Sequence, residues 1–362
     1  MLERFNVPPK DEVRVPEQSL RSTVTAIFEK MGVPRQAAVE GADVLVMTDL
    51  RGVETHGVSN MLRSYVQGYK DKRLNPRPEW HIVREAPGTA TIDADGGLGI
   101  ILGGPAMRLA IEKARKVGVG IVTMYNSGHM GAVGHFAMMA AKEDMVGICM
   151  TALSNRVVPT FAAEPRLGTN PIAVAAPAKS EPPFLFDAAT STIAENKLGL
   201  AARVGANLLP GWVSDNQGGP VTEEIAVPKR GDYYLLPLGS TREQGSHKGY
   251  GLAMMVEVLS TFLAGTLPDA LNPAGRARSH FAAYDIAAFT DVDTFKENLD
   301  SMLKTLRTTP PAEGHERVLY PGLPEYEAEQ DRRANGIPLH KEVIQWFDDI
   351  TAELSLPRLK TM

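Results

Sequence analysis

The first apolar positions of the chain repeat with the spacing of an amphipathic helix. One helical stripe between residues 16 and 34 collects the apolar side chains Leu20, Val24, Ile27, Phe28 and Met31. Gly32 and Pro34 are typical of a helix end, and a second helical stretch runs from Gln36 to Thr48. The chain is therefore expected to begin with a pair of helices.

Beyond residue 75 the pattern alternates between short apolar runs, typical of strands, and helical segments. Residues 75–99 combine short strands with turns, and a helix is predicted from near Pro105 to Gly118. Strands are predicted at 119–124, 145–153, 171–177 and 184–187, and further helices at 135–143, from near Gly249 onward and at 339–354. This alternation predicts the α/β class. Residues 269–279 and 308–316 are rich in Pro, Gly, Ala and charge and are expected to be surface connections.

Composition and charge exclude several classes of protein. With 362 residues, 43% of them apolar, the chain can bury one large core or two modest ones. A formal net charge of -5 gives no basic surface for nucleic acid, and no segment approaches the roughly 18 apolar residues of a membrane span. The charged start of the chain lacks the apolar core of a signal peptide. We therefore expect a cytoplasmic protein with a small-molecule partner, and neither nucleic acid nor membrane as a partner.

The single cysteine, Cys149, excludes an internal disulfide. Its apolar neighbours Val146, Ile148 and Met150 indicate a position in a buried strand. We expect this thiol to be inert.

The stretch YNSGHMGAVGHFAMMAAKED, residues 125–144, places glycines and histidines between a predicted strand and a predicted helix. Gly128, Gly131 and Gly134 lack the G-x-G-x-x-G spacing of a dinucleotide fingerprint, and the stretch has no Lys with Ser or Thr as in a Walker loop. Free N–H groups at the start of the 135–143 helix would still suit a phosphate.

The two histidines of this stretch, His129 and His135, are candidate metal ligands. Their separation is not a usual zinc spacing, and no third Cys or His lies nearby in the sequence. We therefore expect no metal site.

The stretch TDLRGVETHGVSNMLRSY, residues 48–65, interrupts a helical run at Gly52 and presents His56 between Thr55 and Gly57. A histidine in such a loop can exchange a proton near neutral pH, as a general acid or base must. A lone histidine can equally do no more than hydrogen-bond a loop carbonyl. His56 alone therefore does not define a catalytic site.

Polar side chains also occur at the ends of predicted strands and before the helix near Gly249. The strand-end residues are Thr169, Asn170, Asp187, Thr190 and Ser191. Ligands of α/β proteins usually bind at strand ends, although these residues also fit turns and helix caps. His247 and Lys248 either face an anion together with the N–H groups of the helix start, or form a capped helix with a solvated lysine.

Eight segments, in order from Asp49 to Leu339, resemble the malate/L-lactate dehydrogenase family that is unrelated to the Rossmann-type lactate and malate dehydrogenases. They include DLRGVETHGV, LGTNPIAVAAP, PPFLFDAATS, GWVSDNQGGPVTE, LLPLG, HKGYGLAMMVEVL and RRANGIPL, together with the long segment from Gly97 to Ala140. This family includes sulfolactate, ureidoglycolate and diketogulonate oxidoreductases and a cyclic-imine reductase. Together the segments are far more specific than any one of them.

The resemblance implies an α/β fold with a non-Rossmann NAD(P)-binding domain built on a mixed sheet. This domain is expected at residues 119–299, packed on a helix-rich substrate and dimerisation part formed by residues 1–118 and 300–362. It also implies a homodimer with the active site near the subunit contact. The expected cofactor is NAD, with NADP possible.

The resemblance further assigns roles to residues of this chain. His56 matches the group that protonates the substrate carbonyl oxygen, Thr55 its hydrogen-bonding partner, and His129 another active-site histidine. Thr169 and Tyr65 match the substrate site. The matches to cofactor contacts are His135, Phe136, Ala137, Asp187, Ala188, Ala189, Lys248, Pro321, Gly322 and Leu323.

Two departures from the family pattern concern the substrate. Many members carry arginine where this chain has Asn60, a natural clamp for the carboxylate of a 2-oxo acid. Arg63 or Arg51 is the candidate replacement. Lys197 stands where cyclic-imine reductases use an acidic residue, and a cation suits an anionic keto acid better than an iminium-like substrate.

The sequence thus predicts an NAD(P)H-dependent enzyme that interconverts a small 2-oxo acid and its 2-hydroxy acid. Malate and oxaloacetate are the first expected pair. The alternatives are reduction of a cyclic imine acid and a dinucleotide-binding sensor without catalysis.

Overall fold

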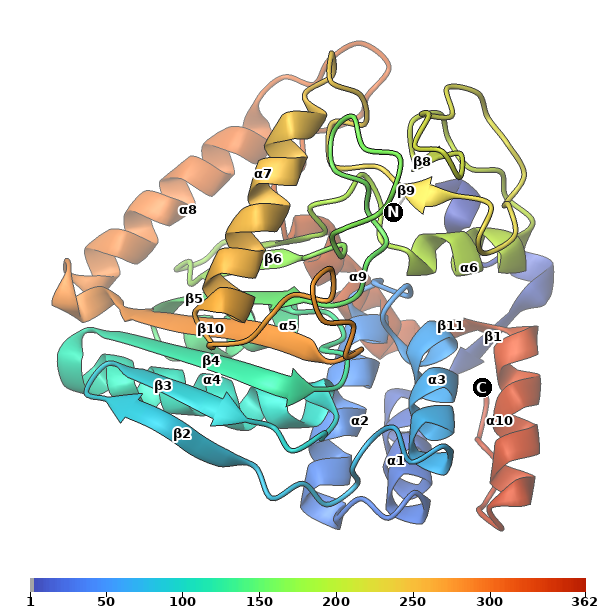
Figure 1. The fold of residues 1–362 in the computed structure, drawn as a ribbon, viewed down its shortest axis with the longest axis horizontal. Coiled ribbons are helices and arrows are strands. Elements are labelled where there is room, and N and C mark those ends of the chain that lie inside the picture. The colour runs from blue at the N-terminus through green and yellow to red at the C-terminus, as the bar shows by residue number, and fades with distance from the viewer. Residues whose placement is uncertain (1–2) are drawn as a thin grey trace.

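A seven-stranded mixed sheet forms the centre of the protein, for which the computed structural model describes residues 3–362 (Figure 1). The strand order is β2-β3-β4-β10-β5-β6-β7. The strands are β2 (His81–Ala86), β3 (Thr89–Asp93), β4 (Val119–Ser127), β5 (Met145–Ala152), β6 (Ile172–Ala176), β7 (Phe184–Ala188) and β10 (Ala277–Asp285). β3 and β4 run parallel, and the other neighbouring strands pair antiparallel.

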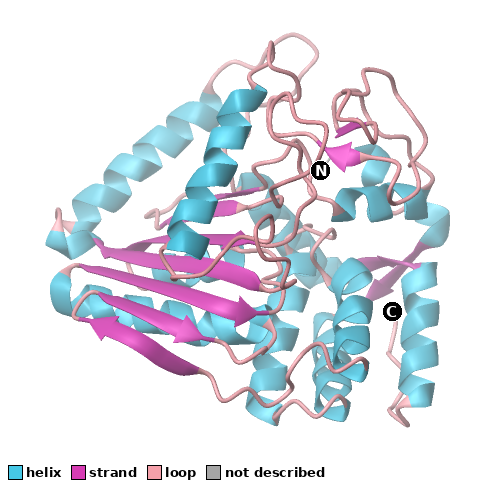
Figure 2. Ribbon diagram, in the orientation of Figure 1, coloured by secondary structure: helices cyan, strands magenta, loops and turns pink. Residues whose placement is uncertain are grey.

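Helices cover both faces of this sheet (Figure 2). On one face lie α4 (Gly99–Val117) and α5 (Gly134–Ala141), and on the other lie α7 (Ser246–Val256) and the following π-helical turn η3 (Glu257–Phe262). The central strand β10 is consequently buried over most of its length. A strand covered on both faces reads as a run of apolar and small residues rather than as an alternating pattern.

The two ends of the chain meet in a helix-rich part beside the sheet (Figure 1). β1 (Glu12–Val15) pairs antiparallel with β11 (Ile337–His340), so that Val15 lies opposite Ile337. The helices of this part are α1 (Glu17–Lys30), α2 (Arg35–Leu50), α3 (Val58–Lys70), α9 (Leu323–Asn335) and α10 (Lys341–Glu353). α2 packs on both α1 and α4 and thereby joins this part to the sheet.

The remaining elements form a smaller apolar cluster and the outer surface. α6 (Asn196–Val204), β8 (Val213–Ser214) and β9 (Tyr234–Leu235) enclose the cluster, in which Phe5 stacks on Trp212 with 5.3 Å between ring centroids. The outer elements are α8 (Val292–Thr308) and the short turns η1 (Glu3–Phe5), η2 (Pro9–Asp11) and η4 (Ile286–Ala288).

The predicted α/β class, with a mixed sheet and a helix-rich part from both chain ends, is confirmed. β2 and β3 are strands of the sheet and α4 packs on it, although the sequence analysis grouped all three with the N-terminal part. Where the domain boundary falls remains a prediction. Among residues 3–362 no helix has the length and apolar character needed to cross a membrane, and the cytoplasmic location also remains a prediction.

The predicted start of the helix near Pro105 is wrong, because α4 begins at Gly99 and holds Pro105 in its interior. Gly103 weakens a helix intrinsically, but it lets α4 approach α5, since a Cβ atom there would lie 2.6 Å from the ring of Phe136. Tertiary packing therefore overrides the local signals. The predicted end is confirmed, because Gly118 ends the helix in the left-handed region with φ of 87°.

The prediction of a surface connection at residues 269–279 is also wrong in part. Residues 277–279 begin the central strand β10, and Asp269 forms a buried ion pair with Arg278. The charged residues of this segment led to the prediction of a surface location. Asp269 and Arg278 can nevertheless be buried because their charges pair with each other. The segment 308–316 is exposed as predicted, and Cys149 is fully buried in β5, where burial raises the pKa of its thiol.

Candidate active site

A buried carboxyl group shapes the loop that carries His56 between α2 and α3. Asp49 is completely buried at the end of α2, and its Oδ2 accepts a hydrogen bond of 2.8 Å from the N–H of Val58. Burial raises the pKa of Asp49 to about 7. A Cβ atom at Gly57 would lie 1.9 Å from Asp49 Oδ1, so glycine is required for this close approach.

Helix α9, from the C-terminal part of the chain, holds the same loop from the other side. Arg332 donates hydrogen bonds of 2.6 Å to the carbonyl of Asp49 and to Oε1 of Glu54. The side chains of Arg332 and Glu54 are 12% and 4% exposed, so this ion pair is almost buried. The sequence analysis did not identify these residues, although charged residues inside the segments DLRGVETHGV and RRANGIPL were a signal for them.

His56 and His129 come together although they lie far apart in the sequence. Their rings stack with 5.7 Å between centroids and 11° between planes. Thr55 Oγ1 lies 2.9 Å from His56 Nδ1, and the hydroxyl of Tyr65 lies 2.8 Å from His129 Nδ1. The predicted catalytic pair, its threonine partner and Tyr65 therefore form one cluster.

The hydrogen bonds of His129 define its neutral form. The N–H of Gly131 donates to His129 Nδ1 at 3.1 Å, and a backbone N–H can only donate. Nδ1 is thus the acceptor, and the proton of the neutral ring is on Nε2. Burial lowers the pKa of His129 to about 3, helped by the neighbouring His56, and lowers that of His56 to about 4. Both rings are neutral at neutral pH.

These neutral buried histidines predict a loss of stability in acid. In the unfolded chain a histidine binds its proton near its ordinary pKa of 6.5, whereas His56 and His129 bind theirs only near 4 and 3. Their stabilisation is therefore present above pH 6.5 and is lost as the pH falls toward 3, each group contributing up to about 1.4 kcal/mol per pH unit. Urea unfolding at several pH values should show a shallower acid decline in His129→Gln. The exposed His315→Gln is the control, and an equal decline in both variants would contradict the assignment.

A cleft of about 510 Å³ has room for an elongated ligand, and its lining residues Val53 and Ala132 each lie three residues before or after a histidine of the pair, His56 or His129. It is bounded by the end of α2, the start of α5, the end of β7 and the start of α9. The predicted cofactor residues His135, Asp187, Pro321 and Gly322 line it together with Arg51 and Lys142. Two cations, three carboxylates and apolar walls at one cleft fit the phosphate, ribose and ring groups of a dinucleotide.

The expected phosphate seat at the start of the predicted 135–143 helix is wrong. Gly134 N–H donates to Oδ2 of Asp187 at 2.7 Å, and His135 N–H donates to the carbonyl of Ala132. The N–H groups at the start of α5 are therefore occupied, and the anion beside them is the carboxylate of the protein itself. Although more than a third of Asp187 is exposed, the surrounding protein raises its pKa to about 6.

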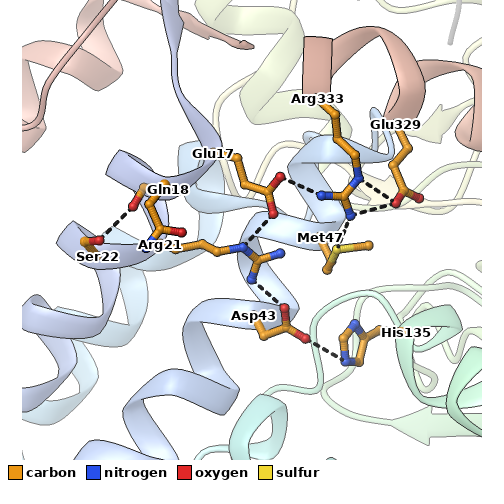
Figure 3. Close-up of polar contacts among 9 residues, drawn as sticks. All are labelled: Glu17, Gln18, Arg21, Ser22, Asp43, Met47, His135, Glu329 and Arg333. Carbon is orange, nitrogen blue, oxygen red and sulfur yellow. Dashed lines mark hydrogen bonds and ion pairs between the residues drawn. The ribbon is translucent and has the colours of Figure 1, made fainter.

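A chain of polar contacts connects the two sides of this cleft (Figure 3), and all of them except that of His135 with Asp43 are ion pairs, because burial lowers the pKa of His135 to about 4. From His135 it passes through Asp43, Arg21, Glu17 and Arg333 to Glu329. Glu329 also pairs with Arg51 at 3.1 Å, and both side chains are largely buried. Arg51 thus lies in the cofactor cleft, where its charge is already balanced by a carboxylate.

Several predicted cofactor residues have side chains outside the cleft. Phe136 and Ala137 are fully buried, and the Phe136 ring packs edge-on against Phe281. Leu323 packs in the apolar cluster of Leu303 and Tyr320. None of these three residues lines the cleft, and the backbone of Phe136 and Ala137 is buried as completely as their side chains. Lys248 is exposed on the first turn of α7, and Ala188 and Ala189 are half-buried at the end of β7, but none of the three lines the cleft.

The residues predicted to bind the substrate are widely separated. Arg63 is exposed on α3, where a guanidinium nitrogen lies 3.6 Å from Oε1 of Glu342 and the guanidinium lies over the ring of Trp346. Both partners belong to α10, so Arg63 contacts α10 and not the histidine pair. Lys197 Nζ lies 4.8 Å from the centroid of the Phe5 ring, and burial lowers its pKa. Thr169 is half-buried, and its carbonyl accepts from Thr190 N–H at 2.9 Å.

Asn60 is held by an arginine that the sequence analysis missed. Arg203 of α6 donates to Oδ1 of Asn60 at 2.9 Å and to the carbonyl of Ser59 at 3.1 Å. The amide of Asn60 in turn lies 3.4 Å from the carbonyl of Thr55. A cation from another element therefore stands at the position where family members carry arginine, a relation that no local motif reveals.

Comparisons with known proteins agree with this architecture. The family model for malate/L-lactate dehydrogenase matches residues 15–348. A malate dehydrogenase of Pyrococcus abyssi is 39% identical over 96% of this chain and 97% of its own length, and an L-sulfolactate dehydrogenase of Methanocaldococcus jannaschii is 34% identical over 93% and 96%. The crystal structure of malate dehydrogenase from Entamoeba histolytica superposes with a TM-score of 0.90 at 33% identity, covering 96% of this chain and 99% of that one.

The fold is that of an oxidoreductase that acts on hydroxy acids. The chain belongs to the malate/L-lactate dehydrogenase family. Membership implies a nicotinamide dinucleotide as cofactor, so the resemblance stated from the sequence is confirmed.

Proposed function

We propose that this protein interconverts malate and oxaloacetate with NAD(H) as its cofactor. The observation that carries the proposal is the buried, neutral His56–His129 pair, held on the loops that also supply Val53 and Ala132 to a cleft with cationic and acidic walls. The malate dehydrogenases among its relatives support the choice of substrate.

His56 is proposed to move the proton. In the oxidative direction the neutral imidazole accepts the hydroxyl proton of the 2-hydroxy acid, and in the reductive direction the imidazolium returns it to the carbonyl oxygen. The bound nicotinamide accepts or supplies the hydride. Because burial lowers the pKa of His56 to about 4, the resting form is the base. An anionic oxo acid beside the ring favours the protonated form that reduction requires.

The neighbours of His56 are proposed to orient it and the substrate. Thr55 fixes the ring through Nδ1, and Tyr65 and Gly131 keep the proton of neutral His129 on Nε2, where it can be donated to a substrate oxygen. Lys197 is proposed to attract a substrate carboxylate, since burial strengthens the attraction of its charge. Thr169 completes the proposed substrate contacts.

The charges of the cofactor cleft support NAD over NADP. Arg51 and Lys142 face Asp187, Glu325 and Glu329, and Arg51 is already paired with Glu329. The cleft therefore has no surplus of positive charge for the extra phosphate of NADP.

Glu329→Gln is expected to shift this preference. Removing the partner carboxylate frees Arg51 for a phosphate, so the ratio of kcat/KM for NADPH to that for NADH should rise by about tenfold. Steady-state kinetics with both cofactors measures the ratio. Glu353→Gln, which removes the same charge from an exposed ion pair with Lys70, is the control. An unchanged ratio in Glu329→Gln would show that the cleft charges do not select the cofactor.

A homodimer is proposed from the resemblance and from the surface of α7 and η3. Met255, Val258, Phe262 and Leu263 are 40%, 51%, 44% and 56% exposed and form an apolar face. Such a face is typical of a protein contact, and a second copy of the chain is the proposed partner.

The test of the proposed function is oxidation of NADH and NADPH by the purified protein with oxaloacetate, pyruvate and a cyclic imine acid. Preferred turnover of oxaloacetate with NADH is the expected result. Turnover of the imine acid alone would overturn the interpretation of Lys197. Tight NADH binding with no turnover of any substrate would instead favour a sensor.

A further inference from the structure

A second cleft, of about 440 Å³, lies between the end of α3, the turn after β3 and the end of β4. It shares none of its lining residues with the cofactor cleft. Its charged residues are the cations Lys72, Arg73 and Arg276 and the carboxylate Asp95. The proposed function uses none of these residues.

Two of these cations have no carboxylate partner among residues 3–362. The ammonium of Lys72 makes neither a hydrogen bond nor an ion pair, and Arg276 donates to carbonyl oxygens, at 2.9 Å to that of Arg73. Arg73 pairs with Asp71 at 3.2 Å. Asp95 Oδ2 is occupied by hydrogen bonds from the Asn75 amide and a backbone N–H. The cleft therefore offers donors and a surplus of positive charge, with Oδ1 of Asp95 as the one carboxylate oxygen of its lining that accepts no hydrogen bond among residues 3–362.

Tyr69 adds a buried donor to this cleft. Its side chain lines the cleft and is 8% exposed, and its hydroxyl has no hydrogen-bond partner. Burial raises the pKa of Tyr69, so the hydroxyl keeps its proton. An unpartnered buried hydroxyl is costly, and each one in a native protein requires an explanation. An oxyanion bound in the cleft would supply the missing acceptor.

The backbone around the cleft is unusually constrained. Lys72, Asp95 and Asn126 all line it, and all have left-handed φ values, of 58°, 48° and 58°. Non-glycine residues adopt this region at a cost, and such residues concentrate at binding sites. The strain is consistent with a site whose shape is set before a ligand arrives.

We propose that this cleft binds a small dianion, a phosphate or a dicarboxylate, and that the bound anion regulates the active site through His129. Two short stretches of the chain connect the cleft to this residue. Tyr69 lies one helical turn after Tyr65, which hydrogen-bonds His129. On the other side, Asn126 in the cleft precedes Gly128, whose N–H donates at 2.7 Å to the carbonyl of Gly97.

Titration calorimetry with inorganic phosphate and with malonate, against sodium chloride at matched ionic strength, tests the binding. We expect saturable binding of at least one probe to the wild-type protein, and at least about tenfold weaker binding to the double variant Lys72→Gln/Arg276→Gln. The control double variant Lys229→Gln/Lys304→Gln removes the same charge from two exposed lysines and should bind as the wild type does. Malonate can also bind at the catalytic site. Binding there should be the same in the wild type and in Lys72→Gln/Arg276→Gln, which distinguishes it from binding in the second cleft.

A second variant keeps the test independent of folding. Tyr69→Phe removes only the unpartnered hydroxyl, so it should retain the thermal stability of the wild type while weakening the binding of the probe severalfold. Absence of saturable binding, or equal binding by the wild type and Lys72→Gln/Arg276→Gln, would overturn the site. The probe that binds identifies the ligand as a phosphate or a carboxylate.

Steady-state kinetics with the bound probe test whether the anion regulates the active site. Saturating probe should change kcat/KM for the oxo acid by at least about twofold in the wild type and leave Lys72→Gln/Arg276→Gln unchanged. The same change in both proteins would assign the effect to the catalytic site. An unchanged kcat/KM in the wild type would overturn the link to His129.

Discussion

His56→Ala is expected to lower kcat for oxaloacetate reduction by at least about a hundredfold, because the reaction then lacks the group that donates the proton. The dissociation constant for NADH should change by less than about twofold, since His56 does not line the cofactor cleft. Stopped-flow turnover and fluorescence titration with NADH measure the two quantities. Together they separate loss of chemistry from loss of the cofactor site.

Thr55→Val is the companion variant for this prediction. It keeps the shape of the neighbour of His56 but removes the hydroxyl that lies 2.9 Å from Nδ1. A smaller loss, of about tenfold, is expected because the ring remains and only its orientation is less restricted. Wild-type turnover by His56→Ala would remove the imidazole from the mechanism.

Arg332→Met should cause the largest loss of stability, about 3–5 kcal/mol, because it leaves Glu54 buried without its partner. Arg332 also holds the carbonyl of Asp49, so the loop that carries His56 is released at the same time. Chemical unfolding measures the free energy of unfolding. A fall in kcat measures how far the loop that carries His56 is displaced.

Two further variants test the cause of this loss. Glu54→Gln combined with Arg332→Met removes both charges of the ion pair and leaves neither one unpaired, so most of the lost stability should return. Arg333→Met changes the neighbouring arginine, whose ion pairs are more exposed, and should cost about 1 kcal/mol or less. Equal losses in Arg332→Met and Arg333→Met would refute the buried ion pair as the anchor of the loop.

The sequence predicted elements best where burial follows a simple period. The amphipathic stripe of α1 and the apolar runs of β4, β5, β6 and β7 were all located, because one face or both faces of each element are buried. β10 was missed because its small and polar residues give no such period, although neighbouring strands and helices on both faces cover it. Its place is decided by tertiary contacts.

The candidate site was likewise predicted only in part. His56 stood out as a histidine in a glycine-bounded loop, and the family resemblance added His129, which the structure brings onto it. The position of Arg63 beside Trp346 depends on α10, and the occupation of the α5 start by Asp187 depends on β7. Neither long-range contact leaves a local sequence pattern. The assigned roles of these residues remain predictions.

The central claim is that the protein removes hydride from C2 of malate while His56 takes the hydroxyl proton. The most direct test is incubation with NAD⁺ and malate deuterated at C2, followed by NMR of both products. The account predicts oxaloacetate together with NADH that carries the deuterium, and strongly reduced formation of both in His56→Ala. Formation of NADH without deuterium, or failure to oxidise malate at any NAD⁺ concentration, would contradict it.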